Sequence, residues 1–172
     1  MKRNFLFNSI TIFIVLLPGI VNAQMPNFPP DTTVRDAPDF SLTDLNGVSI
    51  VSDDLKGDIV VVNFWGIKCQ PCVQEIPGLN QLMHELDTLN VHFIGITGDS
   101  TESVKEFLIQ HPFEYTLCAA SDYQKLMIQF NPFPAVPLHF IINKDWKIVY
   151  RHVGKLDSEN LLLFKQMIKE LL

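Results

Sequence analysis

Residues 63–72 read Asn63-Phe64-Trp65-Gly66-Ile67-Lys68-Cys69-Gln70-Pro71-Cys72. The segment ends an apolar run that begins at Ile59, and such a run is typical of a strand buried on both faces. Apolar residues at helical spacing follow from Ile76 to Leu86 and predict a helix. Cys69 and Cys72 therefore lie where a buried strand meets a helix, and their spacing allows a disulfide within a tight loop.

The two thiols are expected to differ in their chemistry. Cys69 lies at the predicted start of the helix, where unpaired backbone N–H groups and the helix dipole lower the pKa of a thiol below its ordinary value of about 8.5. Lys68 adds positive charge beside it. Cys72 comes one turn later, so we expect it to be more buried and to act as the resolving thiol. Pro71 suits a first helical turn, because its missing N–H costs nothing there.

Three other uses of a cysteine pair are less favoured. A structural zinc site needs four ligands, whereas Cys118 is remote in the sequence and the five histidines are scattered singly. Covalent haem attachment needs a histidine directly after the second cysteine, and Val73 stands there. A structural disulfide across so short a loop would constrain little chain entropy. The pattern favours redox chemistry by the cysteine pair itself, with no metal and no other cofactor.

Predicted strands and helices alternate through the rest of the chain. Strands are expected within 39–51, 59–64, 91–96, 115–117 and 138–151, and helices at 76–86, 100–110, 122–130 and 156–172. The dipeptide Asn46-Gly47 suits the turn of the first hairpin. The last helix is expected to begin at a cap of Asp157 or Ser158 and to bury one stripe, formed by Leu161, Leu162, Phe164, Ile168 and Leu171. This order predicts an α/β fold, with helices on both faces of one sheet and an added N-terminal β-hairpin.

The N-terminal residues have the pattern of a secretory signal. Lys2 and Arg3 precede an apolar run that Pro18 breaks, and small residues ending at Ala23 suit a signal peptidase. The run is short for a membrane span, which needs roughly 20 apolar residues, so an uncleaved anchor is the lesser alternative. We therefore expect a signal peptide at 1–23, an extended proline-containing tether at 24–36 and a domain at 37–172. This pattern predicts export to the periplasm.

The composition excludes several classes of protein. The 172 residues include 13 basic and 19 acidic side chains, and this formal net charge of -6 argues against a nucleic-acid partner. A hydrophobic share of 47% does not fit a disordered chain. Three cysteines are too few for a small domain held together by disulfides. We expect a compact monomer.

The motifs resemble those of the thioredoxin superfamily, and within it the exported thiol:disulfide oxidoreductases of the TlpA and ResA group. The resemblance runs from Ala37 to the C-terminus and rests on four segments, Ala37-Pro38-Asp39-Phe40, Asn63-Phe64-Trp65, Cys69-Gln70-Pro71-Cys72 and Glu75-Ile76-Pro77. It implies a thioredoxin-like fold with a central mixed sheet. It also implies an enzyme that exchanges disulfides with protein substrates.

The resemblance implies roles for residues outside the cysteine pair. Glu75 matches the acid that this group carries three residues after its second cysteine, and it would take the proton of Cys72. The alternative is that Glu75 is an ordinary solvated helix residue. Pro137 matches the cis-proline that lies beside the disulfide, and the backbone of Val136 would pair with an extended substrate. The other expected substrate contacts are Trp65, Lys68 and Pro71.

In the expected mechanism, the Cys69 thiolate attacks a substrate disulfide and Cys72 resolves the mixed disulfide. The family suggests the reducing direction, with electrons from a membrane thiol donor and a possible role in cytochrome c maturation. One alternative is a thiol peroxidase, although Gly66 stands where a peroxiredoxin has a threonine. Another is a non-catalytic module that binds a metal through the two cysteines.

A few residues depart from the family pattern. Lys68 replaces an aromatic residue, and Trp146 stands on a turn, where we expect it to be exposed. Cys118 is additional and is expected to be buried. Of the five histidines, only His139, two residues after Pro137, is a candidate for the site.

Overall fold

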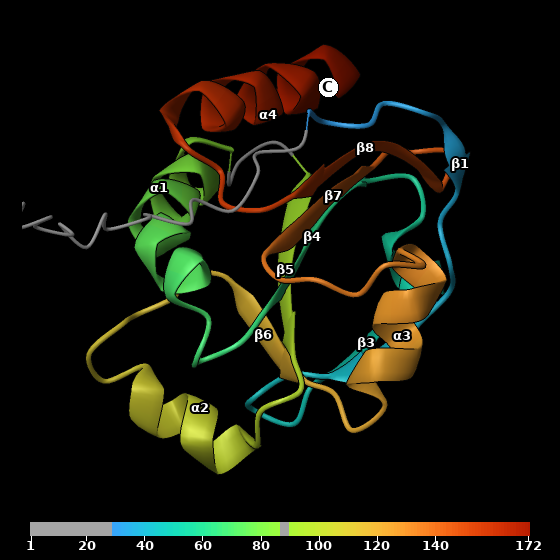
Figure 1. Ribbon diagram of the computed structural model, residues 1–172. Coiled ribbons are helices and arrows are strands. Elements are labelled where there is room, and N and C mark those ends of the chain that lie inside the picture. Colours follow the sequence, from blue (N-terminus) through green and yellow to red (C-terminus); the bar gives the residue numbers. More distant parts are fainter. Residues whose placement is uncertain (1–28, 87–89) are drawn as a thin grey trace, which may run out of the picture.

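The computed structural model describes residues 29–86 and 90–172 (Figure 1). The predicted signal peptide and the first five residues of the predicted tether lie outside the described residues. Of the remaining tether, Asp31 bridges to Arg151, and β1 (Arg35–Asp36) pairs with the last strand of the sheet. This part of the segment is therefore held against the domain by main-chain hydrogen bonds.

The central sheet is mixed, as predicted. Its six strands lie in the order β1-β8-β7-β4-β5-β6. The parallel strands are β4 (Ile59–Trp65), β5 (Val91–Thr97) and β6 (Thr116–Ala119), and the antiparallel strands on the other side of β4 are β7 (Leu138–Ile142) and β8 (Lys147–Val153). Every residue of β4 is buried, because layers cover both faces of the sheet.

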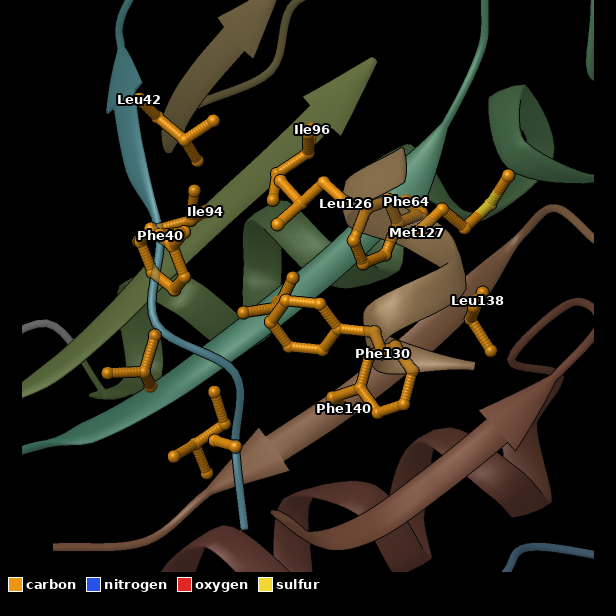
Figure 2. Packing of buried hydrophobic residues seen from close by; sticks show 14 of the residues in the cluster. Phe40, Leu42, Phe64, Ile94, Ile96, Leu126, Met127, Phe130, Leu138 and Phe140 are labelled. Atoms are coloured by element: carbon orange, nitrogen blue, oxygen red, sulfur yellow. The ribbon is translucent and has the colours of Figure 1, made fainter. Parts of the chain in front are cut away.

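Each face of the sheet has its own hydrophobic cluster, and alternate residues of β4 point to opposite faces. On one face, Ile59 and Val61 pack against α1 (Gln70–Leu86) and α4 (Ser158–Leu171). On the other face, Val60 and Phe64 pack against α3 (Tyr123–Phe130). Figure 2 shows this second cluster, in which the ring of Phe130 lies 5.3 Å from that of Phe64 and 5.1 Å from that of Phe140.

Three shorter elements complete the fold. The predicted N-terminal hairpin forms from β2 (Ser41–Thr43) and β3 (Ser49–Val51), followed by a 3-10 turn η1 (Ser52–Leu55). Gly47 in its turn has φ +88, a conformation that suits glycine. The helix α2 (Thr101–Phe107) connects β5 to β6 along the chain and ends three residues before Gln110, the predicted end of this helix.

Two predictions about buried side chains were wrong. Leu162 is 67% exposed, because its neighbour Leu161 faces the core and adjacent residues of a helix cannot share one face. Trp146 is only 9% exposed, because its ring packs 5.9 Å from that of Phe40, and the turn that carries it folds back over the core. The cap of α4 is Asp157, whose side chain accepts a hydrogen bond from the backbone N–H of Asn160.

Candidate active site

The two cysteines lie at the junction of β4 and α1, as the sequence predicted. They form a disulfide with an S–S distance of 2.06 Å and a Cα–Cα distance of 5.3 Å. Cys72 is 1% exposed, whereas Cys69 is half-buried. Cys69 is thus the sulfur that another molecule reaches, and Cys72 lies behind it.

The start of α1 directs backbone N–H groups toward Cys69. The N–H of Cys72 donates to the sulfur of Cys69 over 3.3 Å, and the N–H of Val73 donates to the carbonyl of Cys69 over 3.1 Å. A negative charge on the Cys69 sulfur would be stabilised by the first contact and by the helix dipole. Lys68 is exposed beside it, as expected for a residue that meets a partner.

Two side chains from other parts of the chain, one in the loop after β5 and one in α3, hold the loop that leads to Cys69. The carboxylate of Asp99 accepts from the N–H of Ile67 at 2.9 Å and from the hydroxyl of Thr97 at 2.8 Å. The hydroxyl of Tyr123 donates to the carbonyl of Trp65 at 3.2 Å. Burial, with a smaller contribution from Asp99, raises the pKa of Tyr123 to about 12, so this hydroxyl keeps its proton.

Neither Asp99 nor Tyr123 was predicted from the sequence as part of the site. A signal for Asp99 was present, because it follows the buried strand β5, which runs parallel to β4. Residues that follow adjacent parallel strands meet at the same edge of a sheet, where α/β proteins place their sites. Tyr123 gave no comparable signal, since it begins a helix on a different part of the chain.

A groove of about 690 Å³ runs beside the exposed sulfur. Its lining residues come from the loop, from the ends of β4 and β5, from α3 and from the segment before β7, and they are Trp65, Gly66, Lys68, Cys69, Gln70, Pro71, Thr97, Gly98, Asp99, Tyr123 and Val136. The groove therefore brings together four of the five expected substrate contacts.

The fifth expected contact, Pro137, follows the groove residue Val136, and the peptide bond between them is cis, as predicted. The carbonyl of Pro137 accepts a hydrogen bond from the N–H of Gly154 at 2.9 Å, which ties this segment to the end of β8. Trp65 differs from the other expected contacts because it is only 1% exposed and packs 4.4 Å from the ring of Phe113. It shapes the wall of the groove and presents little surface to a partner.

Glu75 is buried, with 4% of its surface exposed, so it is not an ordinary solvated helix residue. Its Oε2 atom accepts a hydrogen bond from the N–H of Leu156 at 3.1 Å and lies 3.3 Å from Nε2 of His139. Because Glu75 follows Cys72 by three residues, the two side chains lie on the same buried side of α1. Glu75 thus places a buried carboxyl group one helical turn after Cys72.

Further buried polar groups continue from Glu75 into the sheet. The Nδ1 atom of His139 lies 3.2 Å from the amide nitrogen of Asn63 on β4. His152 on β8 is the cross-strand neighbour of His139, with 6.2 Å between the ring centroids. Burial and the nearby His139 lower the pKa of His152. His139 was a candidate for the site from its sequence position, whereas His152 was not, although both occupy the same face of a predicted hairpin.

Cys118 lies outside the site. It is fully buried on β6, as predicted, opposite Ile96 of β5. Burial, with a smaller contribution from Asp44, raises the pKa of its thiol to about 12. This thiol is therefore inaccessible and protonated near neutral pH.

Within 29–86 and 90–172, no cluster of three or more potential metal-binding side chains occurs. In the same described part of the chain, no helix has the length and apolar composition needed to cross a bilayer.

Known proteins resemble this chain over most of its length. The pattern of the AhpC/TSA family matches residues 34–151. The thiol-disulfide oxidoreductase ResA of Bacillus cereus is 32% identical over 173 residues, which cover 98% of this chain and 99% of ResA. The Bacillus subtilis protein of the same name is 28% identical, with 98% and 94% covered. The crystal structure of a thiol:disulfide interchange protein from Chlorobium tepidum superposes with a TM-score of 0.68 at 25% identity, covering 82% of this chain and 98% of that one.

Proposed function

This chain belongs to the AhpC/TSA family of thioredoxin-like proteins, and from that premise we propose that it is a thiol:disulfide oxidoreductase that reduces disulfides in other proteins. The observation that carries the proposal is the disulfide between Cys69 and Cys72, which has one half-buried and one fully buried sulfur at a helix start beside a groove. The two ResA proteins, whose similarity extends over 98% of this chain, are thiol-disulfide oxidoreductases by name and support thiol:disulfide exchange.

The proposed reaction begins with the dithiol form. The Cys69 thiolate attacks one sulfur of the substrate disulfide, so that a bond forms between Cys69 and the substrate and one substrate thiolate leaves. Cys72 then loses its proton to Glu75 and attacks the Cys69 sulfur. The second substrate thiolate leaves, and the substrate has gained two electrons while the cysteine pair has lost two.

The groove supports a protein substrate. In the described part of the chain, the N–H and carbonyl of Val136 make no main-chain hydrogen bond, and this residue lines the groove together with Cys69. An extended segment of a substrate would pair with these groups as an additional strand pairs with a sheet edge. Lys68 would add an attraction for acidic segments.

We further propose that the protein acts after export, with a membrane thiol donor that returns electrons to the cysteine pair. The basic, apolar and small-residue segments of 1–23 support export. The family resemblance supports the proposed reducing direction and the proposed role in cytochrome c maturation. The reduction potential of the Cys69–Cys72 couple tests the direction, because a strongly reducing value is expected of a reductase and an oxidising value would indicate a disulfide donor.

A peroxidase is not favoured. Gly66 stands three residues before Cys69, where a peroxide-binding hydroxyl is needed, and the nearest side-chain atom to a Cβ built there is the Asp99 carboxylate at 3.4 Å. An anionic oxygen accepts hydrogen bonds and cannot donate one to a peroxide.

Trapping tests the proposal. The variant Cys72→Ser cannot resolve the mixed disulfide, so substrate proteins should accumulate on Cys69 as complexes that a reductant releases. The double variant Cys72→Ser/Cys69→Ser is the matched control and should trap nothing. Complexes that persist in this control, or that disappear when Cys118 is replaced by alanine, would show that the cysteine pair is not the redox centre.

A further inference from the structure

Four buried polar side chains from four elements form a chain of neighbours that begins at Glu75, one helical turn after Cys72. They are Asn63 of β4, Glu75 of α1, His139 of β7 and His152 of β8, and their exposed fractions are 3%, 4%, 0% and 0%. Buried polar groups cost free energy unless each finds a partner, so their arrangement shows which atoms donate and which accept.

The hydrogen on the His139 ring can be assigned from its neighbours. Nδ1 lies 3.2 Å from the amide nitrogen of Asn63, and an amide nitrogen only donates. Nδ1 must therefore accept, so the ring hydrogen of a neutral His139 is on Nε2. The Nε2 atom lies 3.3 Å from Oε2 of Glu75. In this structure, which has the disulfide formed, the two atoms are close but not aligned as a hydrogen bond.

Both donors near Glu75 face the same carboxylate oxygen. The backbone N–H of Leu156 reaches Oε2 at 3.1 Å, and Nε2 of His139 faces it from β7. The other oxygen, Oε1, is buried and has no hydrogen-bond partner among the residues that the structure describes. One oxygen is thus held in place while the other remains free to accept a proton.

Burial favours the neutral forms of the other two titratable side chains buried nearby, His152 and Tyr115. Nε2 of His152 donates to the carbonyl of Lys155 at 3.3 Å, and burial lowers the pKa of this ring. Burial and the charge of Glu75 raise the pKa of Tyr115 well above its ordinary value. Asp157 acts on His152 from the start of α4 by its charge. Within the described cluster, His139 is therefore the side chain that directs an N–H group at Glu75.

We propose that His139 is a positioning residue that keeps buried Glu75 in its carboxylate form and leaves Oε1 as the oxygen that accepts the Cys72 proton. A carboxylate in an apolar interior otherwise takes up a proton and loses its capacity to act as a base. Donors directed at the charged form oppose this effect. The inference rests on the proposed function, because it concerns the step in which Cys72 resolves the mixed disulfide.

The proton of the Cys72 thiol moves to Oε1, the Cys72 sulfur forms a bond with the Cys69 sulfur, and the bond between Cys69 and the substrate sulfur breaks. The substrate leaves as a thiolate with the electron pair of the broken bond. His139 changes no bond and acts only through Glu75.

The test uses the full reduced protein and the aromatic disulfide dithiobis-nitrobenzoate as the substrate probe. Attack by Cys69 releases one coloured thiolate, and resolution by Cys72 releases the second, so stopped-flow absorbance separates the two steps. In His139→Leu, the pH at which the second phase reaches its maximum should rise by about 1–3 units, so that its rate at neutral pH falls about tenfold or more. The first phase should keep its wild-type profile.

Matched variants separate this role from a structural one. His139→Gln keeps an amide donor near the position of Nε2 and should retain most of the second phase. His152→Gln changes the neighbouring buried histidine and should leave the pH profile unchanged. Glu75→Gln should slow the second phase at every pH, and adding His139→Leu should slow it no further, because His139 acts through Glu75.

Each outcome has one meaning. An unchanged second phase in His139→Leu, or a double variant slower than Glu75→Gln, would overturn the role of His139. Absence of both phases in the wild-type protein would instead overturn the proposed function. If His139→Leu does not fold, nitrogen NMR of the wild-type protein decides, because the proposal requires the hydrogen on Nε2 and a ring protonated only on Nδ1 contradicts it.

Discussion

Replacing Asp99 should loosen the loop that carries Cys69 and lower the stability of the whole domain. The Oδ2 atom of Asp99 accepts from the N–H of Ile67 at 2.9 Å and from the hydroxyl of Thr97 at 2.8 Å. A hydrogen bond to a charged group contributes about 1.5–3 kcal/mol, and the lower value applies because Asp99 is partly exposed. Asp99→Ala should therefore lower the free energy of unfolding by about 3 kcal/mol. Asp99→Asn keeps an oxygen that can accept both hydrogen bonds but removes the charge, so it should lower the free energy of unfolding by about half as much.

Urea unfolding followed by tryptophan fluorescence measures these losses, with the disulfide intact in every variant. Tyr123→Phe is a useful reference, because it removes a single neutral bond to the carbonyl of Trp65 and should cost about 1 kcal/mol. The pKa of Tyr123, about 12, should fall in Asp99→Ala but stay above its ordinary value of 10.0, because burial is the larger cause. A free energy of unfolding for Asp99→Ala within 0.5 kcal/mol of wild type, below the contribution of even one such bond, would refute this reasoning.

Three further predictions concern residues away from the loop. Cys118 should not react with iodoacetamide in the native protein at neutral pH, since it is buried and the pKa of its thiol is about 12. Modification of Cys118 while the protein stays folded would contradict its burial. Burial lowers the pKa of His152, so the unfolded chain binds a proton there more readily than the native one. Above a pH of 6.5, the ordinary pKa of histidine, His152 is neutral in both states and does not affect stability. As the pH falls below 6.5, the unfolded chain takes up the proton first, so the free energy of unfolding decreases. This loss should be smaller in His152→Gln when urea unfolding is compared between pH about 7 and 5, and equal losses would argue against it. Gly95→Ala should lower the melting temperature through an overpacking cost of about 1–3 kcal/mol, because a Cβ there would lie 2.5 Å from Leu117 and 3.2 Å from Trp65. An unchanged melting temperature would show that this wall of the groove adapts freely.

The cysteine pair shows how far local sequence patterns reach. Its position at a strand–helix junction and the burial of Cys72 were both predicted, because each depends on residues within one or two turns of chain. The cis bond before Pro137 was expected from the family resemblance, which rests on short motifs, and it is present. The cap of α4 was left between two neighbouring residues, and only hydrogen-bond geometry selected Asp157.

The errors and omissions have a different physical origin. Trp146 was expected on the surface because the turn pattern describes only its neighbours in sequence, whereas its burial depends on Phe40, far along the chain. Leu162 was assigned to the buried stripe because Leu161 and Leu162 are equally apolar, and the rotation of a helix against a sheet decides which of two neighbours faces inward.

The sequence by itself determined the redox pair, the order of strands and helices and the family to which the chain belongs. These features depend on short-range spacing, which a linear pattern records. Only the tertiary structure decided what surrounds the pair. Asn63 reaches His139 across 76 residues, Leu156 reaches Glu75 across 81, and Asp99 reaches Ile67 across 32. Hydrogen bonds between residues so distant in sequence form only after the sheet brings neighbouring strands into register, so the surroundings of Glu75 and of the loop before Cys69 are a property of the folded sheet.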